Sequence, residues 1–193
     1  MADRAAEPTH RLQSLRPLGG RSPLAEDVGP VRLTEVTDVA LASLAARRGR
    51  EEEVAARASS AGIPLPPPGR SEQGATWGAL WLGPSQWMLE APFTTHEDVV
   101  AHLRPTFGDA ASITEQTDAW VRLDVEGPLA PLMERLCNLD LATFGPGSAT
   151  RTLMEHVGVL AVRRAPDRMT LLAGRSFAGS LHHALMAAAQ SAF

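Results

Sequence analysis

The spacing of apolar residues in this chain predicts the same order of elements twice: a strand, a helix, two strands joined by a tight turn, and a helix. Hairpins that alternate with helices are typical of an α+β domain in which helices cover one face of an antiparallel sheet. Each copy alone is small. We therefore predict an α+β fold of two pseudo-repeated units, at about 31–110 and 111–193, which share a core and form a single domain over 31–193.

The first copy predicts, in order, a strand at 31–36, a helix that begins near Val39 and ends at Gly62, a hairpin of residues 75–82 and 87–90, and a helix that follows Thr94 or Thr95 and ends before Pro105. The hairpin is the clearest element because Gly83-Pro84-Ser85-Gln86 is a typical four-residue turn between two apolar runs. Trp77 and Trp81 should share one face of their strand, and Trp87 should lie on the neighbouring strand. This spacing favours core or interface packing over a ligand box.

The second copy predicts a strand at 119–125, a helix that begins at Gly127-Pro128, strands at 153–162 and 169–172, and a final helix from about 178 to 190. The first of these helices has an apolar stripe with the spacing of a core-facing helix, at Leu129, Leu132, Met133 and Leu136. Cys137 lies at the edge of that stripe. Since the chain has one cysteine, an intramolecular disulfide is excluded, and we expect Cys137 to be a small core residue that is inert to thiol reagents.

Residues 1–30 are expected to form an extended N-terminal arm, because charged residues, Gly19-Gly20 and several prolines interrupt every helical or strand period. Such an arm is either disordered or ordered against a partner. It should contribute little to the core, so deletion of residues 1–25 should leave the thermal midpoint nearly unchanged. We see no apolar signal or spanning segment, and with the single cysteine this predicts a cytoplasmic protein with no membrane partner.

The composition excludes several kinds of chemistry. All 18 basic residues are arginine and tyrosine is absent, which excludes a Schiff-base lysine, a P-loop lysine and a phenolic acid or base. The formal net charge of −4 and the lack of a basic stripe argue against nucleic acid as a partner. No metal-ligand spacing of histidines, Gly-x-Gly-x-x-Gly motif or Gly-x-Ser-x-Gly motif is present. We therefore predict no catalytic, cofactor-binding or metal-binding residue.

Four stretches, taken together and in this order, carry a resemblance to a known family. They are Arg21-Ser22-Pro23-Leu24, Trp81-Leu82-Gly83-Pro84-Ser85-Gln86-Trp87, Glu115-Gln116-Thr117-Asp118-Ala119-Trp120 and Arg175-Ser176-Phe177-Ala178-Gly179-Ser180-Leu181. With these stretches the chain resembles, from about residue 21 onward, the gamma subunit of bacterial heterotetrameric sarcosine oxidase, and its length also suits that subunit. His182 departs from the family pattern, in which a bulky aromatic residue is expected in the final helix.

The resemblance implies a fold like the tetrahydrofolate-binding domain of aminomethyltransferases. It also implies membership in a complex that oxidatively demethylates sarcosine to glycine, passes the one-carbon unit to tetrahydrofolate or releases formaldehyde, and makes hydrogen peroxide. FAD, FMN, NAD, zinc and tetrahydrofolate are expected on the other subunits. The gamma subunit is expected to be non-catalytic and to dock on the large alpha subunit, with beta and delta subunits in the same complex.

The predicted subunit interface consists of the arm and the Trp-rich hairpin. Arg21 is its expected anchor, because a guanidinium in an extended segment can bind carboxylates or carbonyl groups of a partner. Leu24 and one of the hairpin tryptophans, foremost Trp81 or Trp87, would supply the apolar centre that interfaces usually need.

Two other hypotheses stay open. The first is a stand-alone folate-binding protein of one-carbon transfer, which would need a buried carboxylate facing the pterin; Asp118 and Glu126 are the candidates. The second is a free-standing dimeric interaction module. Binding of tetrahydrofolate would distinguish the folate-binding protein from the gamma subunit. The mass of the isolated chain would distinguish the dimeric module from it.

Overall fold

The computed structural model describes residues 15–193, and two antiparallel sheets form its framework. The six-stranded sheet has the order β1 (Ala25–Val28), β2 (Val31–Val36), β8 (Trp120–Glu126), β11 (Arg168–Gly174), β10 (Val157–Ala165) and β9 (Ala149–Met154). The five-stranded sheet has the order β4 (Ser71–Gln73), β5 (Gly78–Gly83), β6 (Gln86–Pro92), β3 (Val39–Ala46) and β7 (Ala111–Glu115). Neighbouring strands pair antiparallel in both sheets. The α+β class expected from the sequence is confirmed.

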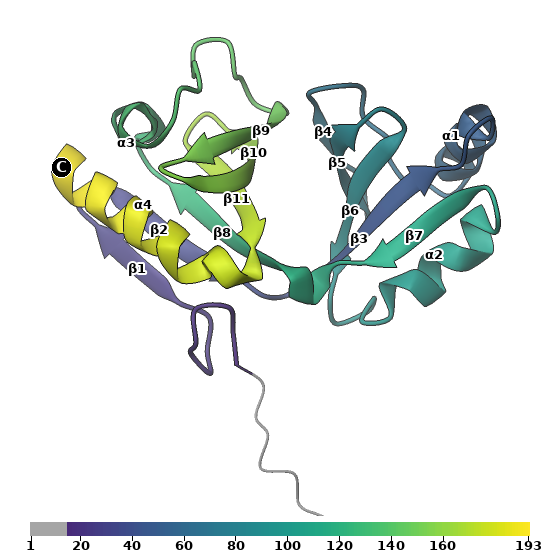
Figure 1. Cartoon of the computed structure of the whole chain (residues 1–193), viewed down its shortest axis with the longest axis horizontal. Helices are drawn as coiled ribbons and strands as arrows, with labels where there is room; N and C mark the ends of the chain where they lie inside the picture. Colours follow the sequence, from purple (N-terminus) through teal and green to yellow (C-terminus); the bar gives the residue numbers. More distant parts are fainter. Residues whose placement is uncertain (1–14) are drawn as a thin grey trace, which may run out of the picture.

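Helices cover the outer face of each sheet, so that the molecule consists of two lobes (Figure 1). The helices of the six-stranded lobe are α3 (Leu129–Leu136) and α4 (Ala178–Ala192), and those of the five-stranded lobe are α1 (Glu51–Ser60) and α2 (Val99–Phe107). Two short 3-10 helices, η1 (Thr117–Ala119) and η2 (Arg175–Phe177), precede β8 and α4.

The buried apolar residues form three clusters rather than one. One cluster lies between the six-stranded sheet and its helices, and a second lies between the five-stranded sheet and its helices. A third, smaller cluster joins the inner faces of the two sheets through residues that include Leu41, Leu80 and Leu160. The core shared by the two lobes is therefore the smallest of the three, and the pseudo-repeat itself stays a prediction.

The chain crosses between the sheets at two places. After β2, residues 37 and 38 lead from the six-stranded sheet into β3 of the five-stranded sheet. After β7, the chain returns through η1 to β8 of the six-stranded sheet. The two crossings bring polar segments together where the lobes meet (Figure 1). In this arrangement each half of the chain contributes one or more strands to the sheet formed mainly by the other half.

The helix expected from Val39 is wrong over its first part, since Val39–Ala46 is β3 and α1 begins at Glu51. β3 lies between β6 and β7, with α2 on one side and the other sheet on the opposite side. Residues 40–42 and Leu44 are almost completely buried. A strand that is buried on both faces shows a continuous apolar run, which periodicity alone does not distinguish from a buried helix.

The hairpin is confirmed, because β5 and β6 pair antiparallel with Trp81 opposite Trp87. Its first strand begins at Gly78, however, so Trp77 precedes the strand and does not share a strand face with Trp81 as expected. The single strand expected at 153–162 is wrong: β9 and β10 are two paired strands, and Glu155 at their turn has a positive φ of 53°. The helix expected to end before Pro105 continues past it, since α2 ends at Phe107 and contains Pro105. The unexpected strands β1, β4 and β7 are short and lie at sheet edges, where sequence alternation is weak.

The part of the predicted arm that the structure describes is bound to the six-stranded sheet. Its last residues, Ala25–Val28, form β1. The buried carboxylate of Glu35 on β2 accepts hydrogen bonds from Leu18 N at 3.0 Å and from Leu24 N at 3.1 Å. These bonds argue against the expectation that deletion of the arm leaves the stability of the chain unchanged. Residues 1–14 of the arm lie outside the described residues.

Among residues 15–193, no helix is both long enough and apolar enough to span a membrane.

Candidate functional site

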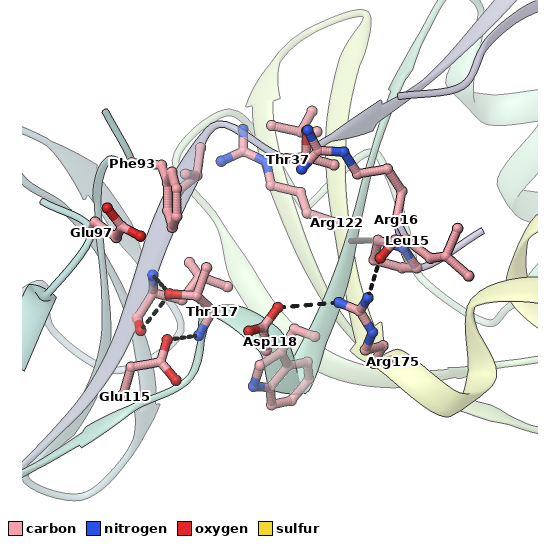
Figure 2. Close-up of a pocket in the computed structure, with 15 residues that line it drawn as sticks. Leu15, Arg16, Thr37, Phe93, Glu97, Glu115, Thr117, Asp118, Arg122 and Arg175 are labelled. Atoms are coloured by element: carbon pink, nitrogen blue, oxygen red, sulfur yellow. Dashed lines mark hydrogen bonds and ion pairs between the residues drawn. The ribbon is translucent and has the colours of Figure 1, made fainter. Parts of the chain in front are cut away.

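A cavity of about 340 Å³ lies where the two crossings run side by side. Figure 2 shows the residues that line it. Its walls come from residues 15–17, the crossing at 36–39, the segment after β6, the η1 crossing, and two arginines of the six-stranded lobe. Because these segments are far apart in the sequence, the cavity exists only in the folded chain.

Hydrogen bonds hold the η1 crossing in place. The hydroxyl of Thr117 accepts from Leu41 N at 3.0 Å, and Thr117 N donates to Glu115 Oε1 at 2.6 Å (Figure 2). The indole nitrogen of Trp120 donates to Gln116 Oε1 at 3.0 Å. These bonds within the crossing and to β3 fix this wall of the cavity.

Charged side chains of both signs surround the cavity; apart from Asp118 of η1, which pairs with Arg175, their signs follow the lobes. Arg16, Arg122 and Arg175 come from the six-stranded side, whereas Glu97 and Glu115 come from the five-stranded lobe (Figure 2). The cavity is therefore dipolar, with guanidinium groups on one side and carboxylates on the other.

Arg175 lines the cavity and is held by two hydrogen bonds. Its Nη1 donates to Asp118 Oδ1 at 3.3 Å and its Nη2 donates to the carbonyl oxygen of Leu15 at 2.6 Å. This side chain therefore connects η2, the η1 crossing and the loop that precedes β1. The Asp118 side chain is 93% exposed, so the ion pair itself contributes little to stability.

A network of buried charges lies between the sheets and adjoins the cavity. Arg164 on β10 donates to both carboxylate oxygens of Glu90 on β6, and Arg122 on β8 binds Asp124 through Nε at 3.1 Å and Nη2 at 3.2 Å. The hydroxyl of Thr170 donates to Asp124 Oδ1 at 2.8 Å. A second cavity of about 470 Å³ is lined by Glu90, Arg164 and Arg122, so Arg122 contributes to both cavities.

The electrostatic environment keeps Arg122 charged. Burial alone would lower the pKa of its guanidinium, but the charges of Glu90 and Asp124 and the hydrogen bond to Asp124 outweigh this effect and raise the pKa. A permanently charged arginine between two lobes can bind anions or hold the lobes together, and it cannot act as a base.

Arginines, carboxylates, threonines and apolar side chains line the two cavities. Neither cavity is lined by a cysteine, a histidine or a serine. Within residues 15–193, no group of three or more His, Cys, Asp and Glu side chains could hold a metal ion. The arrangement can therefore recognise a charged group through arginine and an apolar group through Phe93 and Trp120.

The structure does not bring the predicted interface residues together. Arg21 is exposed and Leu24 is half-buried in the loop before β1 of the six-stranded lobe. Trp81 and Trp87 are half-buried and face each other across β5 and β6 of the other sheet, and the Trp87 indole donates to Pro66 O at 2.9 Å. Trp77 is a core residue, 8% exposed. The interface assignment stays a prediction.

Neither carboxylate suggested for folate is buried. Asp118 is bound to Arg175, and Glu126 is half-exposed beside Arg168 at 3.9 Å. The buried carboxylates of the described chain are Glu35 and Glu90, and sequence analysis missed both.

A signal for the buried charges was present in the sequence. Glu90 interrupts an apolar strand, and Arg122 and Asp124 alternate with Val121, Leu123 and Val125. In a strand this alternation places both charges on one face. Whether that face lies against solvent or against a second sheet is decided by the tertiary fold, and in this molecule it lies against a second sheet.

Comparison with known proteins finds similar structures but no matching protein family. No protein-family model matches the chain, and no curated protein matches it. The fold is similar to a chain of the heterotetrameric sarcosine oxidase from Corynebacterium sp. U-96 in complex with pyrrole 2-carboxylate, with a TM-score of 0.72 and 24% identity over 86% of this chain and 87% of that one. It is also similar to glycine cleavage system aminomethyltransferase T from Bartonella henselae, with a TM-score of 0.59 and 16% identity over 80% of this chain. This chain spans 45% of that aminomethyltransferase. At these identities the likeness establishes the fold.

Proposed function

We propose that this chain is the non-catalytic gamma subunit of a heterotetrameric sarcosine oxidase. Such a complex oxidatively demethylates sarcosine to glycine and yields hydrogen peroxide together with formaldehyde or methylene-tetrahydrofolate. The observation that carries the proposal is the match to a whole chain: the likeness to the Corynebacterium complex covers 86% of this chain and 87% of that one. The aminomethyltransferase, by contrast, extends well beyond the matched region.

The chemistry of the inter-sheet region supports a non-catalytic role. Arg122 pairs with Asp124 and Arg164 pairs with Glu90, and neither cavity is lined by a cysteine, a serine or a histidine of the described chain. In the proposed complex, FAD, FMN, NAD, zinc and tetrahydrofolate reside on the other subunits. This chain docks on the large alpha subunit, and the beta and delta subunits complete the assembly.

The alternative of a stand-alone folate-binding protein fits the described residues less well. A pterin ring needs an acceptor carboxylate in a desolvated site. Asp118 is exposed, and the buried Glu90 already receives two hydrogen bonds from Arg164. The residues present therefore do not form the expected folate site, and no step of a folate-dependent reaction is assigned to this chain.

Purification of the tagged full-length chain from its own cells tests the subunit role. We expect a complex that forms hydrogen peroxide from oxygen only when sarcosine is added, and that contains flavin. Arg21→Ala and Trp81→Ala should lower the yield of this complex, whereas Arg151→Ala, at an exposed arginine outside the predicted interface, should not. Recovery of the chain without any sarcosine-dependent activity would contradict the proposal.

Two measurements on the isolated chain separate the alternatives. Calorimetry with tetrahydrofolate should give no binding at micromolar concentration, and binding at that level would favour the stand-alone folate protein. Sedimentation should give the mass of one 20.6 kDa chain, and a stable mass of twice this value would favour the dimeric module.

A further inference from the structure

The cavity beside η1 contains one cation without a partner in the described part of the chain. Arg122 is bound to Asp124, and Arg175 is bound to Asp118 and Leu15. Arg16 is half-buried and lines the same cavity, and its guanidinium makes no hydrogen bond or ion pair with residues 15–193. A partly desolvated guanidinium without an acceptor binds an anion more favourably than a guanidinium that is already paired with a carboxylate.

The position of Arg16 is set by the fold. Its backbone N–H donates to Gly20 O at 2.9 Å, and its carbonyl oxygen accepts from Gly19 N at 2.8 Å. On either side of Arg16, Leu15 O is bound by Arg175 and Leu18 N is bound by Glu35. The loop therefore fixes the Arg16 backbone beside the cavity, and Figure 2 shows the side chain among the residues that line it.

Apolar groups form a second part of the binding surface. Phe93 and Trp120 line the cavity together with Val36 and Leu41. Because the Trp120 indole N–H is bound to Gln116, the aromatic ring is the part of this side chain that is left for a ligand. Rings of this kind bind flat apolar groups well.

We propose that this cavity binds a small carboxylate with an apolar body, the carboxylate on the Arg16 guanidinium and the body against Phe93 and Trp120. A planar guanidinium binds a carboxylate through two parallel hydrogen bonds. The volume of about 340 Å³ is near the lower end of ligand pockets, roughly 300 to 1,000 Å³, and so favours a compact ligand. The inference does not depend on the proposed subunit role.

Two kinds of compound share this chemistry. A simple organic acid would use the Arg16 side of the cavity alone. A free amino acid would also carry an ammonium group, for which Glu97 and Glu115 on the opposite lobe are the acceptors at hand (Figure 2). In both cases the carboxylate is the group that Arg16 recognises.

Three probes of nearly the same size test the proposal on the purified full-length chain. They are 3-phenylpropionate, phenylalanine and phenethylamine, titrated by ligand-observed NMR up to about 10 mM. The first two should bind and phenethylamine, which lacks a carboxylate, should not. Tighter binding of phenylalanine than of phenylpropionate would identify the amino acid as the source, and the reverse order would identify the organic acid. Failure of both carboxylates to bind, or equal binding of phenethylamine, would overturn the proposal.

Variants locate the bound carboxylate. Arg16→Gln should weaken binding of phenylpropionate roughly tenfold or more, since one charged donor is lost. Arg21→Gln removes an exposed arginine from the same loop outside the cavity and is the matched control. Circular dichroism of both variants should equal that of the unmodified chain, since neither side chain is part of a core. Equal affinity of the two variants would overturn the assignment to Arg16 even if the probe binds.

Discussion

Arg164 on β10 donates from a single nitrogen, Nη2, to both carboxylate oxygens of Glu90 on β6, at 2.7 Å each. The two strands belong to different sheets, so this ion pair connects the inner faces of the lobes. The side chains are 12% and 5% exposed. Next to the small apolar cluster between the sheets, the pair determines how the two lobes fit together, because a charge left without its partner here would be largely desolvated.

Replacement of Arg164 by methionine should destabilise the chain strongly. Glu90 would keep only the more distant Arg122, at 3.8 Å, and an unpaired buried charge costs about 3 to 5 kcal/mol. Arg122 offsets part of this, so we expect the free energy of unfolding in urea to fall by about 3 kcal/mol. The control is Arg168→Met, which removes an exposed pair to Glu126 at 3.9 Å and should change the stability by less than about 1 kcal/mol.

A second variant separates the ion pair from general packing. If the cost of Arg164→Met comes from the stranded carboxylate, the double variant Glu90→Met with Arg164→Met should be more stable than Arg164→Met alone. A double variant that loses the sum of the two single losses would show instead that packing around each side chain sets the cost.

Removal of residues 1–24 should destabilise the six-stranded lobe. The Glu35 carboxylate is 2% exposed and would lose the donors Leu18 N and Leu24 N. An unsatisfied buried group costs about 1 to 3 kcal/mol, so we expect a fall in the free energy of unfolding of at least about 2 kcal/mol, measured in urea. In a Glu35→Met background the same deletion should cost less, because no carboxylate is left to satisfy. An equal cost in both backgrounds would show that the loop acts through other contacts.

Elements marked by a clear local pattern of apolar residues were predictable from the sequence. The β5–β6 hairpin follows from a turn of known type between two apolar runs, and Trp87 lies on the strand next to Trp81 as expected. α3 and α4 follow from apolar stripes with helical spacing. Each of these signals is local, so no knowledge of the neighbouring sheet was needed.

The arrangement between the lobes was not predictable in the same way. β3 is covered on both faces and so loses the alternation by which strands are recognised. The charges Glu90 and Arg164 are 74 residues apart in the sequence, and only the packing of two sheets makes them partners. The cavity beside η1 depends likewise on two crossings and a loop, none of which carries a motif.

Cys137 is half-buried at the end of α3 rather than the core residue that was expected, and it should still react slowly with thiol reagents while the chain is folded. Burial raises the pKa of its thiol, and this outweighs a backbone hydrogen bond at Leu139 that lowers the pKa. A raised pKa means that less thiolate is present at a given pH, and thiolate is the reactive form. We expect labelling by a disulfide reagent at pH 8 to be slower in buffer than in denaturing urea. Equal rates would show that the thiol at the end of α3 is not protected by the fold.

Glu53 on α1 should make the stability depend on pH in the acid range. Its pKa lies below its ordinary value, first because it accepts a hydrogen bond from Arg50, and also because of the charges of Arg50 and Arg57; burial opposes this. For a carboxyl whose pKa is lower in the folded state, the stabilisation is present above the unfolded pKa of about 4.3 and is lost as the pH falls through the folded value. Thermal melts should therefore show Glu53→Gln less stable than the unmodified chain at pH 7, with the gap closing below about pH 4. Glu52→Gln, at an exposed neighbour in the same first turn without an arginine partner among residues 15–193, is the control and should give a smaller gap. A Glu53→Gln gap that persists at pH 2 would mean that the variant acts through helix packing rather than through the charge of the carboxylate.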